Sequence, residues 1–116
     1  MTTDTTRTRP LVAVLFGVPL FVEAMRGAFD DLADVHAYAA DGDDVEGLLE
    51  ALKPDGLIVE GRTIPDVRVP APALHVDLEE RRVRIRRAGA WDVLDIDLTP
   101  PDIRNALMAG VIGARP

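Results

Sequence analysis

The chain has 116 residues, with 13 basic and 20 acidic side chains and a formal net charge of −7. This length corresponds to one ordinary domain that is large enough to bury a core. The sequence contains no cysteine and no serine, which excludes disulfides, thiol and serine nucleophiles and cysteine–zinc sites. The acidic balance argues against general nucleic-acid binding, because phosphate contacts need a basic surface. No apolar run approaches the roughly 20 residues of a membrane span.

The first predicted elements are a tail, a strand and a helix. Residues 1–9 are polar and Thr-rich, which predicts a disordered N-terminal tail before a single domain over 10–113. Leu11–Phe16 is a continuous apolar run, as expected for a strand that is buried on both faces. Pro19 suits the first turn of a helix, and the spacing of the following apolar residues predicts a helix over 19–33. Those residues are Phe21, Val22, Met25, Phe29 and Leu32.

The same region has some features of a secretory signal. Arg7 and Arg9 precede the apolar stretch Leu11–Val22, and Val22-Glu23-Ala24 has the form of a cleavage site. However, Pro19 interrupts the stretch, and the pattern continues into an amphipathic helix. We therefore expect a cytoplasmic protein.

The middle of the chain repeats the alternation of strand and helix. Val35–Ala40 predicts a second strand, and the turn Asp41-Gly42-Asp43 leads into a helix from Val45 to Leu52 that is stopped by Pro54. Gly56–Val59 is a third apolar strand. The order β-α-β-α-β predicts an α/β fold with a parallel sheet covered by helices.

A proline-rich loop and a hairpin are predicted next. Residues 61–73 hold three prolines and show no helical period, so we expect an extended loop. Apolar and polar residues then alternate on both sides of a charged turn. This alternation predicts a β-hairpin over 74–87, in which Asp77 faces Arg84. A helix over 79–88 is the alternative.

A strand and a helix end the chain. Trp91–Ile96 alternates between apolar and polar residues and is expected to be the last strand. Thr99 is expected to cap the final helix, which Pro100 and Pro101 open. Its inward residues are Ile103, Leu107, Met108 and Val111.

Three short segments resemble those of a known family in order and spacing: Val18-Pro19-Leu20 followed by Glu23, Ala39–Gly42 and Lys53–Val59. They resemble the start of the first helix, the turn after the second strand and the approach to the phosphorylated aspartate of bacterial response-regulator receiver domains, in the LuxR-type subfamily. Arg87–Ala90 and Leu98–Pro100 are weaker matches. The resemblance implies a flavodoxin-like parallel sheet flanked by helices, with the third helix missing because the proline-rich loop replaces it.

The residues that carry out phosphoryl transfer in that family differ in this chain. The acidic residues that hold magnesium fall on Phe16 and Gly17, and the acceptor aspartate falls on Glu60. The hydroxyl residue falls on His75–Asp77 and the lysine on Asp95–Ile96. The resemblance therefore implies a pseudo-receiver that no longer takes phosphate. We expect no metal site, no cofactor and no enzymatic activity.

Two features are candidate functional sites. Glu60, the equivalent of the phosphoacceptor, is interpreted either as a fixed imitation of a phosphorylated aspartate or as a solvated residue at a strand end. An arginine cluster beside Trp91 is interpreted either as a docking patch for an acidic protein or phosphate, or as a solvated face with cross-strand ion pairs. Trp91 would be an interface anchor or a core residue. The cluster consists of Arg81, Arg82, Arg84, Arg86 and Arg87.

These features predict a phosphorylation-independent pseudo-receiver that acts as a protein-interaction or regulatory module in signal transduction. Its surface would join the arginine cluster, Trp91 and the last helix, and its partner would be a protein, including a second copy in a homodimer, with no nucleic acid and no membrane. The alternative is a small-molecule-binding or catalytic α/β domain that uses the crevice at the strand C-termini. A third possibility is a structural subunit that pairs through the arginine hairpin as a sheet edge.

Overall fold

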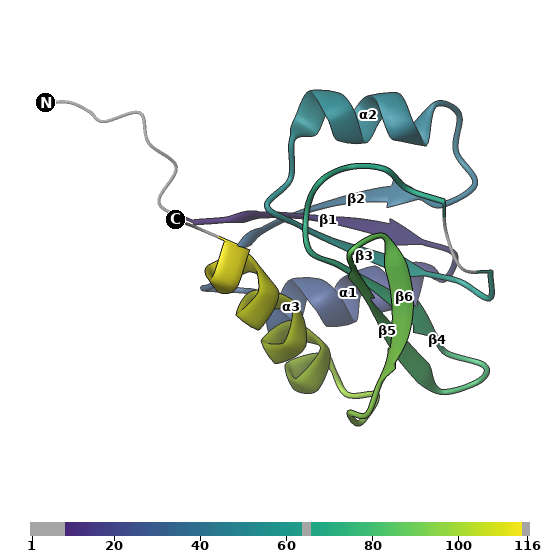
Figure 1. Cartoon of the computed structure of the whole chain (residues 1–116), viewed down its shortest axis with the longest axis vertical. Coiled ribbons are helices and arrows are strands. Elements are labelled where there is room, and N and C mark those ends of the chain that lie inside the picture. The colour runs from purple at the N-terminus through teal and green to yellow at the C-terminus, as the bar shows by residue number, and fades with distance from the viewer. Residues whose placement is uncertain (1–8, 64–65, 115–116) are drawn as a thin grey trace, which may run out of the picture.

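The chain folds into a six-stranded mixed sheet with helices on both faces (Figure 1). The structure is a computed structural model that describes residues 9–63 and 66–114. The strand order is β2-β1-β3-β4-β5-β6. Helices α1 and α3 lie on one face of the sheet and α2 lies on the other (Figure 1). The elements are β1 (Leu11–Phe16), α1 (Pro19–Ala28), β2 (Asp34–Ala39), α2 (Val45–Leu52), β3 (Gly56–Glu60), β4 (Ala73–Asp77), β5 (Arg82–Arg87), β6 (Ala90–Leu94) and α3 (Pro100–Ala114).

The first four strands of this order form a parallel sheet. β1 lies between β2 and β3, and β3 pairs with β4, all in parallel register. Helices α1 and α2 provide the crossovers that parallel neighbours require. The α/β fold and the β-α-β-α-β order predicted from the apolar runs are therefore confirmed for this half of the sheet.

The parallel arrangement does not extend to β5 and β6, which are antiparallel to their neighbours, so the flavodoxin-like parallel sheet implied by the resemblance is not confirmed for this half. The connections explain the difference, because a parallel crossover needs a dozen or more residues and those between β4, β5 and β6 are tight turns. Ala88 and Gly89 form the second turn with positive φ angles of 50° and 83°, as a two-residue hairpin turn requires. The sheet is consequently mixed.

The hairpin predicted over 74–87 is confirmed, and the alternative helix over 79–88 is wrong. Its predicted register is also wrong. Asp77 lies opposite Arg82, and Arg84 lies opposite His75. The β4–β5 turn sets this register, and alternation of residues alone does not reveal the length of a turn.

Helix α1 is shorter than the predicted helix over 19–33, because it ends at Ala28. Gly27 has low helix propensity, and Asp30 and Asp31 place negative charge beside the negative end of the helix dipole. The chain continues in turns, in which the N–H of Leu32 donates to the carbonyl of Phe29. Leu32 is 45% exposed as a result and does not pack inward.

Buried apolar residues in the described part of the chain form two clusters, one on each face of the sheet. The larger cluster joins α1 and α3 to the sheet, with Phe29, Ile103 and Leu107 at most 2% exposed. The smaller cluster joins Leu49 of α2 to β1 and β3, and Val69 and Ala71 of the proline-rich loop complete it. No helix that the structure describes is long and apolar enough to cross a membrane.

The tail predicted at residues 1–9 lies outside the described residues except for Arg9. The guanidinium of Arg9 pairs with the carboxylate of Asp34 at 2.6 Å and donates to the carbonyl of Asp30. This pairing ties the start of β1 to the start of β2.

The segment between β3 and β4 contains no helix in its described residues, so an extended loop replaces the crossover helix as predicted. Arg86 of β5 holds this loop against the sheet. Its guanidinium donates to the main-chain carbonyls of Val67, Val69 and Ala71, and its carbon centre lies 5.8 Å from the ring centroid of Trp91. The described part of the loop belongs to no helix or strand, and the arginine provides a hydrogen-bond donor for three of its carbonyls.

We predict that Arg86→Met lowers the free energy of unfolding by about 2–4 kcal/mol, because it leaves three carbonyls without their charged donor. Urea unfolding followed by the fluorescence of Trp91, the chain's one tryptophan, measures the effect. Arg87→Met is the matched control, since Arg87 is the exposed neighbour on the same strand. Equal stability of the two variants would contradict the role of Arg86.

Candidate functional site

A crevice opens at the C-terminal ends of β1 and β3, where the chain leaves the two strands in opposite directions. The connection after β1 runs toward β2, and the connection after β3 runs toward β4. Open α/β sheets bind ligands at such a position. The cavity has a volume of about 620 Å³ and is lined by Phe16, Gly17, Ala39, Ala40, Asp41, Val59, Glu60, Gly61, Arg62, Thr63 and Asp66.

Glu60 ends β3 beside this crevice and is only 5% exposed. Its carboxylate oxygen Oε1 accepts hydrogen bonds from the N–H groups of Gly17 at 2.8 Å and Val18 at 2.7 Å. Val18 is the N-cap residue of α1, and no side-chain cap comes from Val18 itself. The glutamate therefore caps the helix from another strand and places its negative charge at the positive end of the helix dipole. The interpretation of Glu60 as a solvated residue is wrong.

The N–H groups of Gly17 and Val18 face Glu60 because the β1–α1 junction carries no acidic side chain. Phe16 is apolar and Gly17 has no side chain, so the junction offers donors where a magnesium site needs oxygen ligands. Within residues 9–63 and 66–114, no group of three or more His, Asp or Glu side chains is arranged to hold a metal ion. The junction is thus built to receive an anionic group.

His75 lies in β4, is fully buried and contacts the loop after β3, strand β5 and strand β6. Its Nε2 lies 2.8 Å from the carbonyl of Gly61, and its Nδ1 lies 3.2 Å from the guanidinium of Arg84. A carbonyl only accepts and a guanidinium only donates, so the neutral ring carries its proton on Nε2. Burial lowers the pKa of His75, and the positive charge of Arg84 lowers it further. Trp91 packs edge-on against the ring, with centroids 6.3 Å apart.

Asp77 is 4% exposed and closes the turn between β4 and β5. Its Oδ1 accepts from the N–H groups of Glu79 and Glu80, each at 3.0 Å. The bonds from Glu80 and Glu79 lower the pKa of the Asp77 carboxyl. The sequence predicts alternating apolar and polar residues here, with Asp77 facing Arg84, and it does not reveal that His75 and Asp77 are both buried.

The predicted arginine cluster is divided by the fold. Arg84 bonds to His75 and Arg86 bonds to the loop, so these two guanidinium groups are engaged within the chain. The residues with exposed side chains are Arg81, Arg82 and Arg87. Trp91 is half-buried between the ring of His75 and the guanidinium of Arg86. β5 lies between β4 and β6, so the expectation that the arginine strand forms a sheet edge is wrong.

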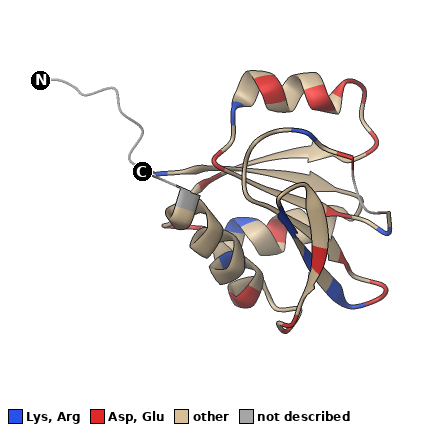
Figure 2. Ribbon diagram, in the orientation of Figure 1, with Lys and Arg blue, Asp and Glu red and all other residues tan. Residues whose placement is uncertain are grey.

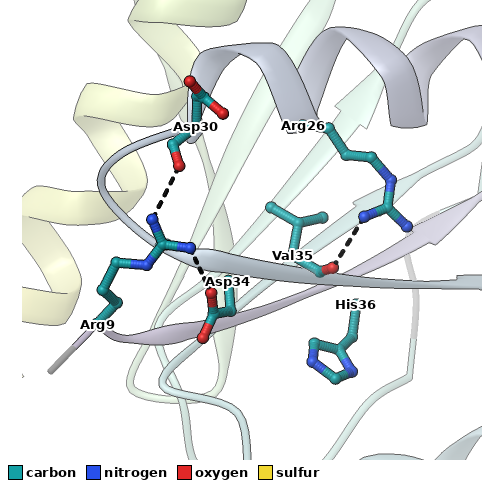
Figure 3. A pocket seen from close by; sticks show the side chains of 7 residues that line it. Arg9, Arg26, Asp30, Asp34, Val35 and His36 are labelled. Atoms are coloured by element: carbon teal, nitrogen blue, oxygen red, sulfur yellow. Dashed lines mark hydrogen bonds and ion pairs between the residues drawn. The ribbon is translucent and has the colours of Figure 1, made fainter. Parts of the chain in front are cut away.

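A second cavity, of about 400 Å³, lies beside β2 and is lined by Arg9, Arg26, Asp30, Ala33, Asp34, Val35 and His36 (Figure 3). Its two guanidinium groups are already bonded, Arg9 to Asp34 and Arg26 to the carbonyl of Val35 at 3.2 Å. His36 lies on the opposite side of the strand from Arg26 (Figure 3). These contacts fasten α1 and its following turn to β2, which is a structural role.

Comparisons with protein-family models, with curated proteins and with solved structures find no match to this chain. The interpretation of function consequently depends on the resemblance of short segments and on the geometry described above.

We predict that Glu60→Ala lowers the free energy of unfolding by about 1–3 kcal/mol, because two N–H groups lose their charged acceptor. Glu60→Gln keeps an acceptor oxygen and loses the charge, so we expect it to lower the free energy of unfolding by less than Glu60→Ala. Urea unfolding measures both, with the exposed Glu50→Ala on α2 as the control. An Ala variant as stable as the wild type would contradict the capping role.

A pH dependence of stability is predicted from His75. Its pKa is lower in the folded chain than the unfolded value of about 6.5, so the unfolded chain binds the proton first. The free energy of unfolding should be at its full value above about pH 6.5 and should fall as the pH drops toward the folded-state pKa. Urea titrations between about pH 7.5 and 5 should show that the free energy of unfolding changes less steeply with pH for His75→Gln than for the wild type. Identical slopes for both proteins would exclude this contribution.

Proposed function

We propose that the chain is a phosphorylation-independent, receiver-like domain that binds a protein partner in the bacterial cytoplasm, and that it is not an enzyme. The observation that carries the proposal is the pair of hydrogen bonds from Gly17 and Val18 to the buried carboxylate of Glu60. The chain itself supplies an anion at the position that the resemblance assigns to the phosphorylated residue. A domain built in this way needs no phosphoryl donor to complete that position.

The strand order supports the flavodoxin-like part of the proposal. The parallel strands are arranged β2-β1-β3-β4, which is how sheets of the flavodoxin type begin. In this proposal the β5–β6 hairpin replaces the helix and parallel strand that end such a sheet. The change leaves α3 on the face where it packs beside α1.

The other groups that phosphoryl transfer requires support the same proposal. Lys53, the chain's one lysine, is the C-cap residue of α2 and precedes β3, so it lies at the opposite end of that strand from Glu60. His75, the first residue of the range His75–Asp77 on which the switch hydroxyl falls, is bonded to Gly61 and Arg84. Metal ligand, acceptor, hydroxyl and lysine are therefore all replaced, and Glu60 is interpreted as a fixed imitation of the phosphorylated state.

The proposed interaction surface is the outer part of the sheet formed by the β5–β6 hairpin. Its exposed arginines are Arg81 and Arg82 at the β4–β5 turn and Arg87 at the β5–β6 turn, where Arg87 pairs with Ala90 and Trp91 follows on β6. Guanidinium groups bind carboxylates in a bidentate manner, which suits an acidic patch on another protein. In this proposal the partner is another protein or a second copy of the chain, with no nucleic acid and no membrane involved.

The alternative function is binding of a small molecule in the crevice at the ends of β1 and β3, which the cavity of about 620 Å³ favours. Arg62 lines this cavity and pairs with Glu79 at 3.3 Å, with 72% of its side chain exposed. A phosphorylated ligand would compete with Glu79 for this guanidinium. The bonds of Glu60 make the protein-binding proposal the stronger one, since they leave its carboxylate committed to the chain.

Partner capture on the immobilised chain tests the proposal. Wild type and Arg68→Glu, which alters an exposed arginine on the loop, should retain the same protein from native-source lysate, while Arg82→Glu/Arg87→Glu should lose it. Retention of no protein by any of the three would contradict the proposal. The alternative predicts instead that a nucleotide or phosphorylated metabolite raises the melting temperature of the wild type but not of Arg62→Ala.

A further inference from the structure

β6 forms one edge of the sheet, and no strand among the described residues pairs with its outer side. An edge strand presents a row of main-chain N–H and C=O groups that can pair with another chain. Here the edge belongs to β6 and not to the arginine strand β5, which has a neighbour on both sides (Figure 1).

The hairpin geometry shows which main-chain groups face outward. Ala88 and Gly89 form a two-residue turn, and in such a hairpin the flanking pair, Arg87 and Ala90, exchanges hydrogen bonds. Hydrogen-bonded and non-hydrogen-bonded pairs then alternate along the ladder, and Trp91 and Val93 belong to non-hydrogen-bonded pairs with β5. Trp91 and Val93 consequently direct their N–H and C=O groups away from β5.

The side chains of the same two residues lie on one face of the sheet, and part of their apolar surface is uncovered. Val93 is 63% exposed, which is unusual for a β-branched apolar residue inside a strand. Trp91 is half-buried and borders a hollow of about 390 Å³ between the loop and the hairpin, together with Arg86 and Gly89. Natural edges are commonly protected by lysine, proline or a bulge, and β6 has no lysine or proline.

The one charged side chain within β6 is Asp92, and the residues that follow the strand are also acidic. Residues 90–103 contain four aspartates and no lysine, arginine or histidine, and Asp92 lies in the middle of β6 (Figure 2). Two copies of β6 could pair antiparallel about a two-fold axis centred on Trp91, Asp92 or Val93. In each case the two Asp92 carboxylates would lie on the same face, either directly opposite or diagonal to each other. Like charges in such positions are destabilising. The charge therefore disfavours a second copy and favours a basic strand.

We propose that β6 accepts an extended segment of a partner protein as a seventh strand, in which apolar residues alternate with lysine or arginine. The apolar side chains of the bound segment cover Val93 and border the hollow beside Trp91. Its basic side chains lie on the other face of the sheet, beside Asp92. Main-chain hydrogen bonds to Trp91 and Val93 provide the affinity, and the alternation provides the specificity. This inference rests on the proposed protein-binding function and specifies the segment of the partner that pairs with the β6 edge, which is distinct from the acidic patch proposed to face the exposed arginines of β5 and its preceding turn.

Binding of a synthetic peptide to the full chain tests this proposal. The probe is fluorescein-labelled Arg-Val-Arg-Val-Arg-Val, measured by fluorescence anisotropy. We expect saturable binding to the wild type and none for Glu-Val-Glu-Val-Glu-Val. A probe that is N-methylated at alternate residues keeps its charge but cannot complete the ladder, so its affinity should fall about tenfold or more.

Two variants locate the site on β6. Asp92→Lys should weaken binding about five- to tenfold, and Val93→Pro, which removes an outward N–H, about tenfold. Asp31→Lys and Ile112→Lys, at exposed positions near the end of α1 and on α3, are the matched controls and should bind like the wild type. Unchanged melting temperatures and Trp91 fluorescence would show that the variants are folded. If Val93→Pro does not fold, the N-methylated probe and Asp92→Lys still decide the test.

Three outcomes would overturn the proposal: no binding to the wild type, equal binding of the N-methylated probe, or a wild-type dimer that Val93→Lys dissociates. The last outcome would make a second copy the occupant of the edge. If the chain captures a partner through Arg82 and Arg87 but fails to bind the peptide, this inference fails and the proposed function stands.

Discussion

The hydrogen bonds between Glu60 and the β1–α1 junction are the interaction on which the functional end of the sheet depends. The N–H groups of Gly17 and Val18 need an acceptor at the start of α1, and neither residue has a side chain that provides one. Glu60 reaches them from β3, because its extra methylene, compared with aspartate, brings the carboxylate back over the junction. The same contact fixes the start of α1 relative to β3.

The connection between β3 and β4, which is an extended loop and not a helix in its described residues, accounts for much of the remaining structure. This loop brings its carbonyls over the sheet, where Arg86 binds three of them and His75 binds the carbonyl of Gly61. His75 comes from β4, the last of the parallel strands, and Arg86 comes from the antiparallel strand β5. The hairpin thus has a structural role on its inner side, and the outer edge of β6 has no paired strand among the described residues.

Most elements could be predicted from the sequence because their signals are local. The apolar runs of β1 and β3 and the proline at the start of α1 each lie within a few residues of the element they specify. The directions of Arg84 and Arg86 could not be predicted, because their partners are 9 to 19 residues away along the chain. The bonds of Glu60 span 42 and 43 residues, so spacing alone gave no sign that a strand-end glutamate caps a helix.

The central claim is that Glu60 makes the domain independent of phosphorylation. The most direct measurement is the intact mass of the chain after incubation with acetyl phosphate and magnesium ions. The account predicts an unchanged mass, because the carboxylate of Glu60 is buried and already bonded to Gly17 and Val18. A gain of one phosphoryl group that Glu60→Gln abolishes would contradict the account.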